Sequence, residues 1–140
     1  MLLFFCLIFS DQIFKSFVAK YLFNNGSKII LISNFLNLTY AENTGIAFSM
    51  LKNLNKYIIV FLVLFVIFLS ILFIFKKSFN NNSKNAFIFI LAGATSNLLD
   101  RLLKGFVIDY IELSLFPSIF NLADIYIILG VFYSFISLFF

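Results

Sequence analysis

Long runs of apolar residues alternate with short polar segments along this chain. Residues 1–23, 57–75, 86–103 and 119–140 form four such runs, and the second is interrupted only by Ser70. A stretch of about 20 predominantly apolar residues is long enough to cross the hydrocarbon core of a bilayer as an α-helix. The pattern therefore predicts a membrane α-helical protein with four transmembrane helices.

The segment 24–56 between the first two runs has a different pattern. It opens with Asn-Asn-Gly-Ser at 24–27, which is typical of a turn, and residues 36–40 alternate apolar and polar side chains that favour β-structure. We expect a small extracytoplasmic β-sheet, a cradle, between helices one and two. No internal repeat or linker divides the chain, so residues 1–140 are expected to form a single domain.

Four spans would fix the side of the membrane on which each connection lies. The segments 24–56 and 104–118 would share one side, and both termini and the loop 76–84 would share the other. Three lysines in the loop 76–84 favour a cytoplasmic location for it, although basic residues also lie near the opposite span ends. The topology therefore predicts a multi-pass protein with cytoplasmic termini.

The composition supports membrane insertion and removes several function classes. The 140 residues are 63% hydrophobic and only 11% charged, which is too apolar for one small soluble core. The formal charge of +4 comes from cations that are scattered, so no nucleic-acid partner is expected. The absence of histidine excludes Ser-His-Asp triads and imidazole zinc sites, and a single cysteine cannot form an intrachain disulfide. We expect neither a metal nor a cofactor.

The third run carries an unusual set of polar residues. Gly93, Asn97 and Asp100 are spaced i, i+4 and i+7, which places them on one face of a helix. Arg101 lies about 100° around the helix from Asp100, so it is expected to reach lipid headgroups or to brace a loop. Carboxylates in an apolar run are rare, and Asp100 is therefore a candidate for chemistry.

Two further polar sets have both a structural and a functional interpretation. Asn121 is a good N-cap residue, and Asp124 three residues later is either part of that cap or a functional carboxylate. Asp11 and Lys15 are spaced i, i+4, so they either neutralise each other in lipid or brace a polar site. The residue types alone leave these alternatives open.

Asp100 and Asp124 would lie at the same membrane face if the predicted topology holds. Two aspartates in a low-dielectric site share a proton, so one can deprotonate water while the other protonates a carbonyl oxygen. Asn43, Asn97 and Asn121 could supply amide hydrogen bonds that orient the carboxylates or a peptide. The spacing permits an aspartic peptidase without requiring one.

Five motifs, in this order on a four-span chain, strongly resemble those of lipoprotein signal peptidase, the type II signal peptidase of bacteria. The resemblance covers about residues 11 to 130. The motifs are Asp11-Gln12-x-x-Lys15, Asn43-x-Gly45-x-Ala47-Phe48, Gly93-Ala94-x-x-Asn97-x-x-Asp100-Arg101, Gly105-x-Val107-x-Asp109 and Phe120-Asn121-x-Ala123-Asp124.

The resemblance implies an aspartic endopeptidase of the bacterial inner membrane, active near its outer face. Such an enzyme removes the signal peptide of diacylglyceryl-modified prolipoproteins by cutting before the lipidated cysteine. It implies Asp100 and Asp124 as the catalytic dyad, membrane lipid as the surroundings and a monomer as the expected state. The remaining residues would line or support the substrate site (Asn43, Gly45, Asn97, Arg101 and Asn121) or act as polar supports (Asp11, Lys15 and Asp109).

Two residues depart from the family pattern, and the polar residues have two rival functional interpretations. Ser96 stands where the family usually has glycine, and Glu42 stands where a basic residue is common. A channel or carrier subunit could use the intramembrane aspartates to conduct protons or cations. A Ser-Lys peptidase could use Lys15 as its base, because burial lowers the pKa of a lysine. The gathering of charges at one face favours a site over a channel.

Overall fold

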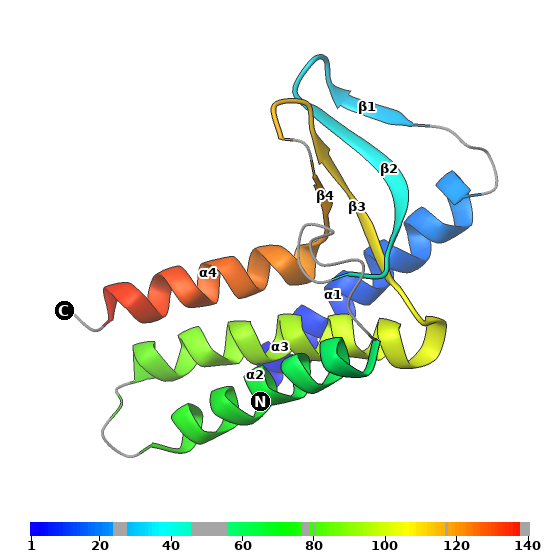
Figure 1. The fold of residues 1–140 in the computed structure, drawn as a ribbon. Coiled ribbons are helices and arrows are strands. Elements are labelled where there is room, and N and C mark those ends of the chain that lie inside the picture. Colours follow the sequence, from blue (N-terminus) through cyan, green and yellow to red (C-terminus); the bar gives the residue numbers. More distant parts are fainter. Residues whose placement is uncertain (24–27, 46–55, 77–78, 80, 117, 138–140) are drawn as a thin grey trace.

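The computed structural model describes residues 1–23, 28–45, 56–76, 79, 81–116 and 118–137, which form four α-helices and one antiparallel sheet (Figure 1). The helices are α1 (Leu2–Val18, continued by the π-helical turn η1, Ala19–Phe23), α2 (Lys56–Phe75), α3 (Asn81–Lys104) and α4 (Leu122–Ile136). The strands are β1 (Ile29–Ile32), β2 (Leu36–Asn43), β3 (Val107–Leu113) and β4 (Ile119–Phe120).

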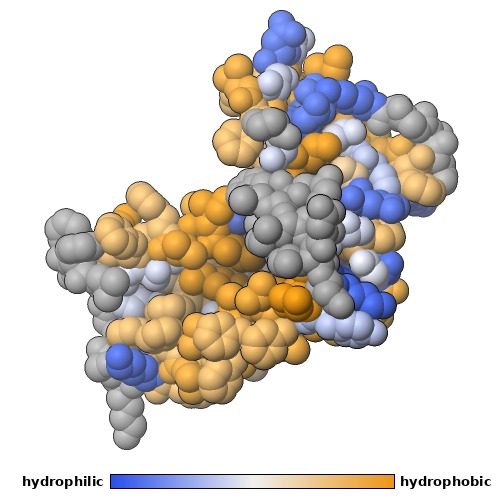
Figure 2. All heavy atoms as spheres, in the orientation of Figure 1, coloured by the Kyte–Doolittle hydropathy of each residue, from blue (hydrophilic) through white to orange (hydrophobic). Residues whose placement is uncertain are grey.

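Three of the described helical segments are long and apolar enough to cross a membrane: Leu2–Phe23, Lys56–Phe75 and Ser83–Lys104. They correspond to the first three predicted spans. The fourth predicted run, 119–140, begins as a strand, and its described helix α4 has 15 residues. Hydrophobic side chains cover most of the helical surface seen in Figure 2, whereas many hydrophilic residues gather toward the sheet. The helices therefore suit a lipid environment.

The sheet has the strand order β1-β2-β3-β4, with all neighbours antiparallel, and it lies at one end of the helices (Figure 1). The prediction placed the sheet in 24–56 alone, and this is corrected, because β3 and β4 come from the connection between α3 and α4. Val107–Leu113 is rich in β-branched and aromatic residues, and it pairs with the edge that β2 would otherwise leave open. The turn predicted at 24–27 lies outside the described residues.

Gly105 connects the end of α3 to β3. Its φ of +86° lies in the left-handed region, which glycine adopts without a steric penalty, and its N–H donates to the carbonyl of Arg101 at 3.1 Å. Buried side chains then hold the sheet on α1 and η1. This cluster consists of Val18, Leu22, Ile108 and Tyr110. The end of α1, the end of α3 and the start of α4 are thereby gathered beside β3.

α3 and α4 approach each other closely along their length. A Cβ atom on Gly93 would lie 2.3 Å from the carbonyl oxygen of Ala123, and one on Gly130 would lie 2.6 Å from that of Ala86. Small residues at helix contacts allow this approach in membrane proteins, where packing and polar contacts drive helix association. The two glycines therefore set the distance between α3 and α4.

We expect Gly93→Ala to lower the free energy of unfolding by about 1 to 3 kcal/mol, because the new methyl group collides with backbone that cannot move aside. Thermal unfolding in detergent measures the effect as a fall in Tm. Leu103→Ala is the matched control on the same helix, since Leu103 is 79% exposed and its truncation is expected to change stability by less than about 0.5 kcal/mol. Equal Tm values for the two variants would contradict this packing.

Candidate active site

The first turn of α4 is held by its own N-cap and by a side chain from α1. Asn121 is its N-cap and forms a capping box with Asp124: the Asn121 side chain accepts from the Asp124 N–H at 2.9 Å, and the Asp124 carboxylate accepts from the Asn121 N–H at 3.4 Å. Asp11 of α1 accepts from the N–H of Ala123 at 3.1 Å. The capping interpretation of Asp124 is confirmed, and the cap fixes the position of its carboxylate.

Lys15 is a fully buried ammonium surrounded by oxygen atoms. Its Nζ lies 2.7 Å from Oδ2 of Asp11 and 3.0 Å from Oδ2 of Asp100, and it donates to Oδ1 of Asn97 at 2.9 Å. The two interpretations of the Asp11 and Lys15 spacing therefore both hold: the residues pair with each other, and the pair braces α3. A buried charge of this kind is tolerated only when it is paired and hydrogen-bonded.

Asp100 is enclosed by donors and cations. Besides Lys15, its carboxylate contacts Nζ of Lys104 at 2.8 Å, Nε2 of Gln12 at 3.3 Å and the N–H of Ile108 at 3.4 Å, and the residue is 1% exposed. Two ammonium groups neutralise this carboxylate and occupy its oxygens. The described contacts of Asp100 are those of a structural ion-pair network that joins α1, α3 and β3.

Asp109 has a different environment. It is 1% exposed on β3, its Oδ2 accepts from Nδ2 of Asn43 at 2.8 Å, and its Oδ1 accepts from Nδ2 of Asn121 at 2.6 Å. Among the described residues, no lysine or arginine nitrogen lies within ion-pair distance of it. Burial, and then the negative charge of Asp124, raise the pKa of Asp109 from 3.8 to about 7.

Asn121 and Asn97 connect Asp109 to Asp124. Asn121 donates to Asp109 through its amide and to Asp124 through its backbone N–H, while Nδ2 of Asn97 donates to Oδ1 of Asp124 at 2.9 Å. The amide of Asn121 also lies 3.3 Å from Oδ1 of Asn97. Two buried carboxylates with neutral amide donors and a coupled proton affinity are suited to general acid and base catalysis. No group of three metal-ligating side chains occurs within the described parts of the chain.

Asn43, Gly45 and Arg101 close the site from the side of the sheet. The N–H of Gly45 donates to Oδ1 of Asn43 at 2.9 Å, which turns the chain and directs the Asn43 amide at Asp109. Arg101 donates to the carbonyl of Gly45 at 2.6 Å and to that of Asn97 at 3.1 Å. The expectation that Arg101 braces a loop is confirmed. The ten predicted site residues all belong to this one connected network.

Three further residues join the network without having been predicted. Oγ of Ser96 donates to Asp11 at 2.6 Å and accepts from Gln12 at 2.9 Å, so the departure from glycine at this position adds a bond between α1 and α3. Lys104 pairs with Asp100, and their i, i+4 spacing on one helix would have allowed this pair to be predicted from the sequence. The contacts of Gln12 and Ser96 depend on how α1 crosses α3, for which the sequence holds no comparable signal. Glu42, the other departure, accepts from the hydroxyl of Tyr40 at 2.9 Å.

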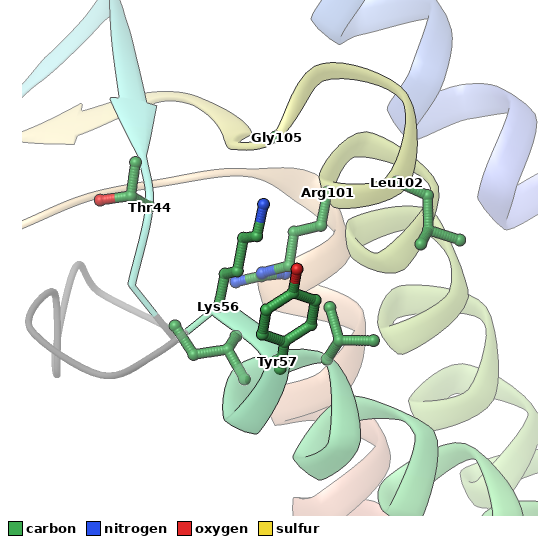
Figure 3. A pocket seen from close by; sticks show the side chains of 8 residues that line it. Thr44, Lys56, Tyr57, Arg101, Leu102 and Gly105 are labelled. Atoms are coloured by element: carbon green, nitrogen blue, oxygen red, sulfur yellow. The ribbon is translucent and has the colours of Figure 1, made fainter.

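Two cavities meet the site at Arg101. The Asp124 cavity, of about 230 Å³, lies between α2, α3 and α4, with Asn97, Arg101 and Asp124 beside the apolar side chains Leu62, Val63, Val66, Ala94 and Ile127. The Arg101 cavity, of about 360 Å³, is shown in Figure 3 between the start of α2 and the end of α3. Lys56 and Tyr57 line it beside Arg101, and Thr44 lies across from them. An extended chain could therefore reach Asp124 along an apolar wall.

The raised pKa of Asp109 has a consequence for stability. Because this pKa is about 7 in the folded protein and 3.8 in the unfolded chain, the folded state retains a proton that the unfolded chain releases between about pH 4 and pH 7. The resulting stabilisation is present below pH 4 and is lost as the pH rises through this window.

We expect the Tm of Asp109→Asn minus that of the wild type to increase as the pH is raised from about 4 to about 8, because the variant does not titrate at this position. Thermal melts in detergent at several pH values give this difference. An effect of the substitution that does not depend on pH shifts every difference equally and leaves the trend with pH unchanged. A difference independent of pH would show that Asp109 ionises normally in the folded protein.

Comparison with known proteins agrees with the geometry. The family model described as "Signal peptidase (SPase) II" matches residues 3–140. The lipoprotein signal peptidase of Caldanaerobacter subterraneus subsp. tengcongensis is 42% identical over 123 residues, covering 88% of this chain and 83% of that protein. The lipoprotein signal peptidase of Clostridioides difficile is 34% identical over 125 residues, covering 89% of this chain and 83% of that protein.

Solved structures show the same fold. A bacterial membrane enzyme determined by the in meso method at 2.3 Å resolution superposes with a TM-score of 0.88 at 27% identity, covering 99% of this chain and 85% of that chain. A second bacterial membrane enzyme, determined at 1.9 Å resolution, gives a TM-score of 0.84 at 30% identity, covering 98% and 90% of the two chains. The chain is therefore a multi-pass membrane protein that belongs to the signal peptidase II family.

Proposed function

We propose that this protein is an aspartic endopeptidase that removes the signal peptide from diacylglyceryl-modified prolipoproteins, cutting before the lipidated cysteine. Membership of the signal peptidase II family supports cleavage of prolipoprotein signal peptides. The observation that carries the aspartic mechanism is the buried pair of carboxylates, Asp109 and Asp124, which Asn121 joins by hydrogen bonds. The hydrogen-bond donors to this pair are side-chain amides and backbone N–H groups.

The catalytic dyad is Asp109 with Asp124, which revises the prediction of Asp100 with Asp124. Lys15 and Lys104 hold the carboxylate of Asp100, and a carboxylate neutralised by two cations is a poor general base or acid. Asp109 has no such partner among the described residues and faces amide donors only. Asp100 becomes a structural support, the role that was expected of Asp109.

The chemistry follows from one proton held between the two aspartates. The ionised carboxylate removes a proton from a water molecule, whose oxygen attacks the scissile carbonyl carbon, while the protonated carboxyl donates its proton to the carbonyl oxygen. The carboxyl that took the proton from water then donates it to the leaving amine, while the other carboxylate takes a proton back from a hydroxyl of the tetrahedral intermediate. The C–N bond breaks, and the pair returns to its starting state. The amides of Asn43, Asn97 and Asn121 need not move during these steps, because they already hold the carboxylates in place.

The substrate's apolar signal peptide is assigned to the Asp124 cavity. Its walls are apolar side chains from α2, α3 and α4, and Asp124 lies at its polar end. Arg101 borders both cavities and donates to the carbonyl of Gly45, so it is positioned to fix a peptide carbonyl as well. The apolar cavity favours a signal-peptide substrate over a soluble peptide.

The placement in the membrane is part of the same proposal. We assign the protein to the bacterial inner membrane as a monomer with four spans, α4 being the fourth, and with both termini in the cytoplasm. The three long apolar helices and the sheet at one end of them support this arrangement. The active site then lies near the outer face.

The contacts of Lys15 weigh against a Ser-Lys peptidase. Its ammonium lies within 3.0 Å of three oxygen acceptors, and two of these belong to carboxylates. An ammonium group held by these acceptors is not available as a base. A channel is also disfavoured, because the described polar network lies beside the sheet instead of extending along the helices.

The proposal is tested by cleavage of a diacylglyceryl-modified prolipoprotein peptide with purified enzyme in detergent, with mass spectrometry of both products. We expect one cut, directly before the lipidated cysteine, and much slower cleavage of the same peptide without lipid. The control is heat-denatured enzyme at the same concentration. A cut at another position, or no cut of the lipidated peptide by folded enzyme, would overturn the proposal.

A further inference from the structure

We propose that Lys15 is a positioning residue that acts on the catalytic carboxylates through the side-chain amide of Asn97. This inference rests on the proposed function and identifies how one part of the site is held ready. Lys15, Asn97 and Asp124 come from α1, α3 and α4, and they form an unbroken chain of two hydrogen bonds, each 2.9 Å long.

The side chains of all three residues are buried. The exposed fractions are 0% for Lys15, 7% for Asn97 and 4% for Asp124. Water therefore cannot replace a lost partner freely, and each polar group depends on the neighbour that the fold provides. The ammonium of Lys15 has three N–H donors, and Asp11, Asp100 and Asn97 supply the three acceptors that it needs when buried.

The two hydrogen bonds of the Asn97 amide can run in only one direction. An ammonium group has only donors, so the carbonyl oxygen of Asn97 must face Lys15, and the NH₂ group must then face Asp124. If the amide were reversed, donor would face donor at Lys15 and acceptor would face the carboxylate at Asp124. The charge on Lys15 therefore selects the one orientation of Asn97 that gives Asp124 a donor.

Asn97 also links Lys15 to the second aspartate, Asp109. The same oxygen of Asn97 lies 3.3 Å from the amide of Asn121, which donates to Asp109 at 2.6 Å. Asn97 thus accepts from Lys15 and from Asn121 together, while it donates to Asp124. Loss of Lys15 would free the Asn97 amide to turn, and both carboxylates would lose fixed donors.

Other titratable and charged groups face this chain from the packed elements, and they define what a pH measurement reports. They are Asp11 on α1, Asp100, Arg101 and Lys104 on α3, and Asp109 and Tyr110 on β3. The positive charge of Lys15 lowers the pKa of Asp109. Because Asp109 is the partner that holds the proton, removal of that charge is expected to move the alkaline limb of the activity profile to higher pH.

A double-mutant cycle tests the inference on the lipidated peptide. We expect Lys15→Met to lower kcat by about 10- to 100-fold while KM changes little, because misplaced catalytic groups slow the chemical step. In an Asn97→Ala background the same change is expected to lower kcat by less than about threefold, since residues that act as one unit are not additive. The alkaline limb of kcat/KM should move to higher pH in Lys15→Met.

Additive losses in the cycle, or an unchanged pH profile in Lys15→Met, would overturn the inference. Because Lys15→Met leaves two buried carboxylates without their ammonium, a second comparison uses Asp11→Asn as the reference and adds Lys15→Met to it, which preserves the charge balance. The same loss of kcat and the same dependence on Asn97 are expected there. If Asp109→Asn and Asp124→Asn keep full activity, the proposed function fails; if they are inactive and the cycle is additive, only this inference fails.

Discussion

Asp124→Asn is expected to reduce kcat for the lipidated peptide by about 10³-fold or more, because the amide can neither accept the proton of water nor supply one to the carbonyl oxygen. The fold should survive, since asparagine retains the size of the side chain and an oxygen that can accept from Asn121 in the capping box. Initial rates are compared for equal amounts of folded enzyme, as judged by thermal melts in the same detergent.

The double variant Asp109→Asn with Asp124→Asn provides the control for this prediction. Two carboxylates that share one proton act as a unit, so removal of both should cost little more than removal of either. Losses that multiply in the double variant would mean that the two groups act in separate steps. Near-normal kcat in Asp124→Asn would leave Asp124 as a helix cap only.

Asp100→Asn is expected to have the largest effect on stability, about 3 to 5 kcal/mol, because it takes one partner out of a buried ion-pair network. Lys15 would keep Asp11 but lose its contact with Asp100 at 3.0 Å, and Lys104 would lose its contact at 2.8 Å. Thermal unfolding in detergent should show a large fall in Tm.

Glu112→Gln is the matched control for this second prediction. It also removes one carboxylate from an ion pair, with Lys28 at 2.7 Å, but the two side chains are 28% and 46% exposed. Pairs of this kind contribute less than about 1 kcal/mol. A fall in Tm for Asp100→Asn no greater than that for Glu112→Gln would show that the buried network does not stabilise the fold.

The membrane helices could be predicted from hydropathy because a long apolar run has few alternatives to a helix in lipid. α2 demonstrates this, since its bounds, Lys56–Phe75, differ from the predicted run by one residue. The sheet was predicted only in part. β3 follows a helix and pairs with a strand more than 60 residues earlier, and strand pairing at this separation leaves no local signal.

The candidate site could be predicted as a set of residues but not in its internal roles. Helical spacing placed Asn97 and Asp100 on one face of α3, and that face does turn toward α1 and α4. The spacing could not show that the ammonium of Lys15 pairs with the carboxylate of Asp100 and occupies it. Asp109 lies in a mixed segment without a helical pattern, and its proximity to Asp124 follows from the pairing of β3 with β4, the strand that precedes α4.

The measurement that tests the account most directly compares Asp109→Asn with Asp100→Asn on one diacylglyceryl-modified peptide, with the rate expressed per folded molecule. The account predicts a loss of about 10³-fold or more for Asp109→Asn and a much smaller loss for the folded fraction of Asp100→Asn, because only Asp109 exchanges a proton with water or substrate. Cleavage by Asp109→Asn at near the wild-type rate, together with an inactive but folded Asp100→Asn, would contradict it and return the dyad to Asp100 and Asp124.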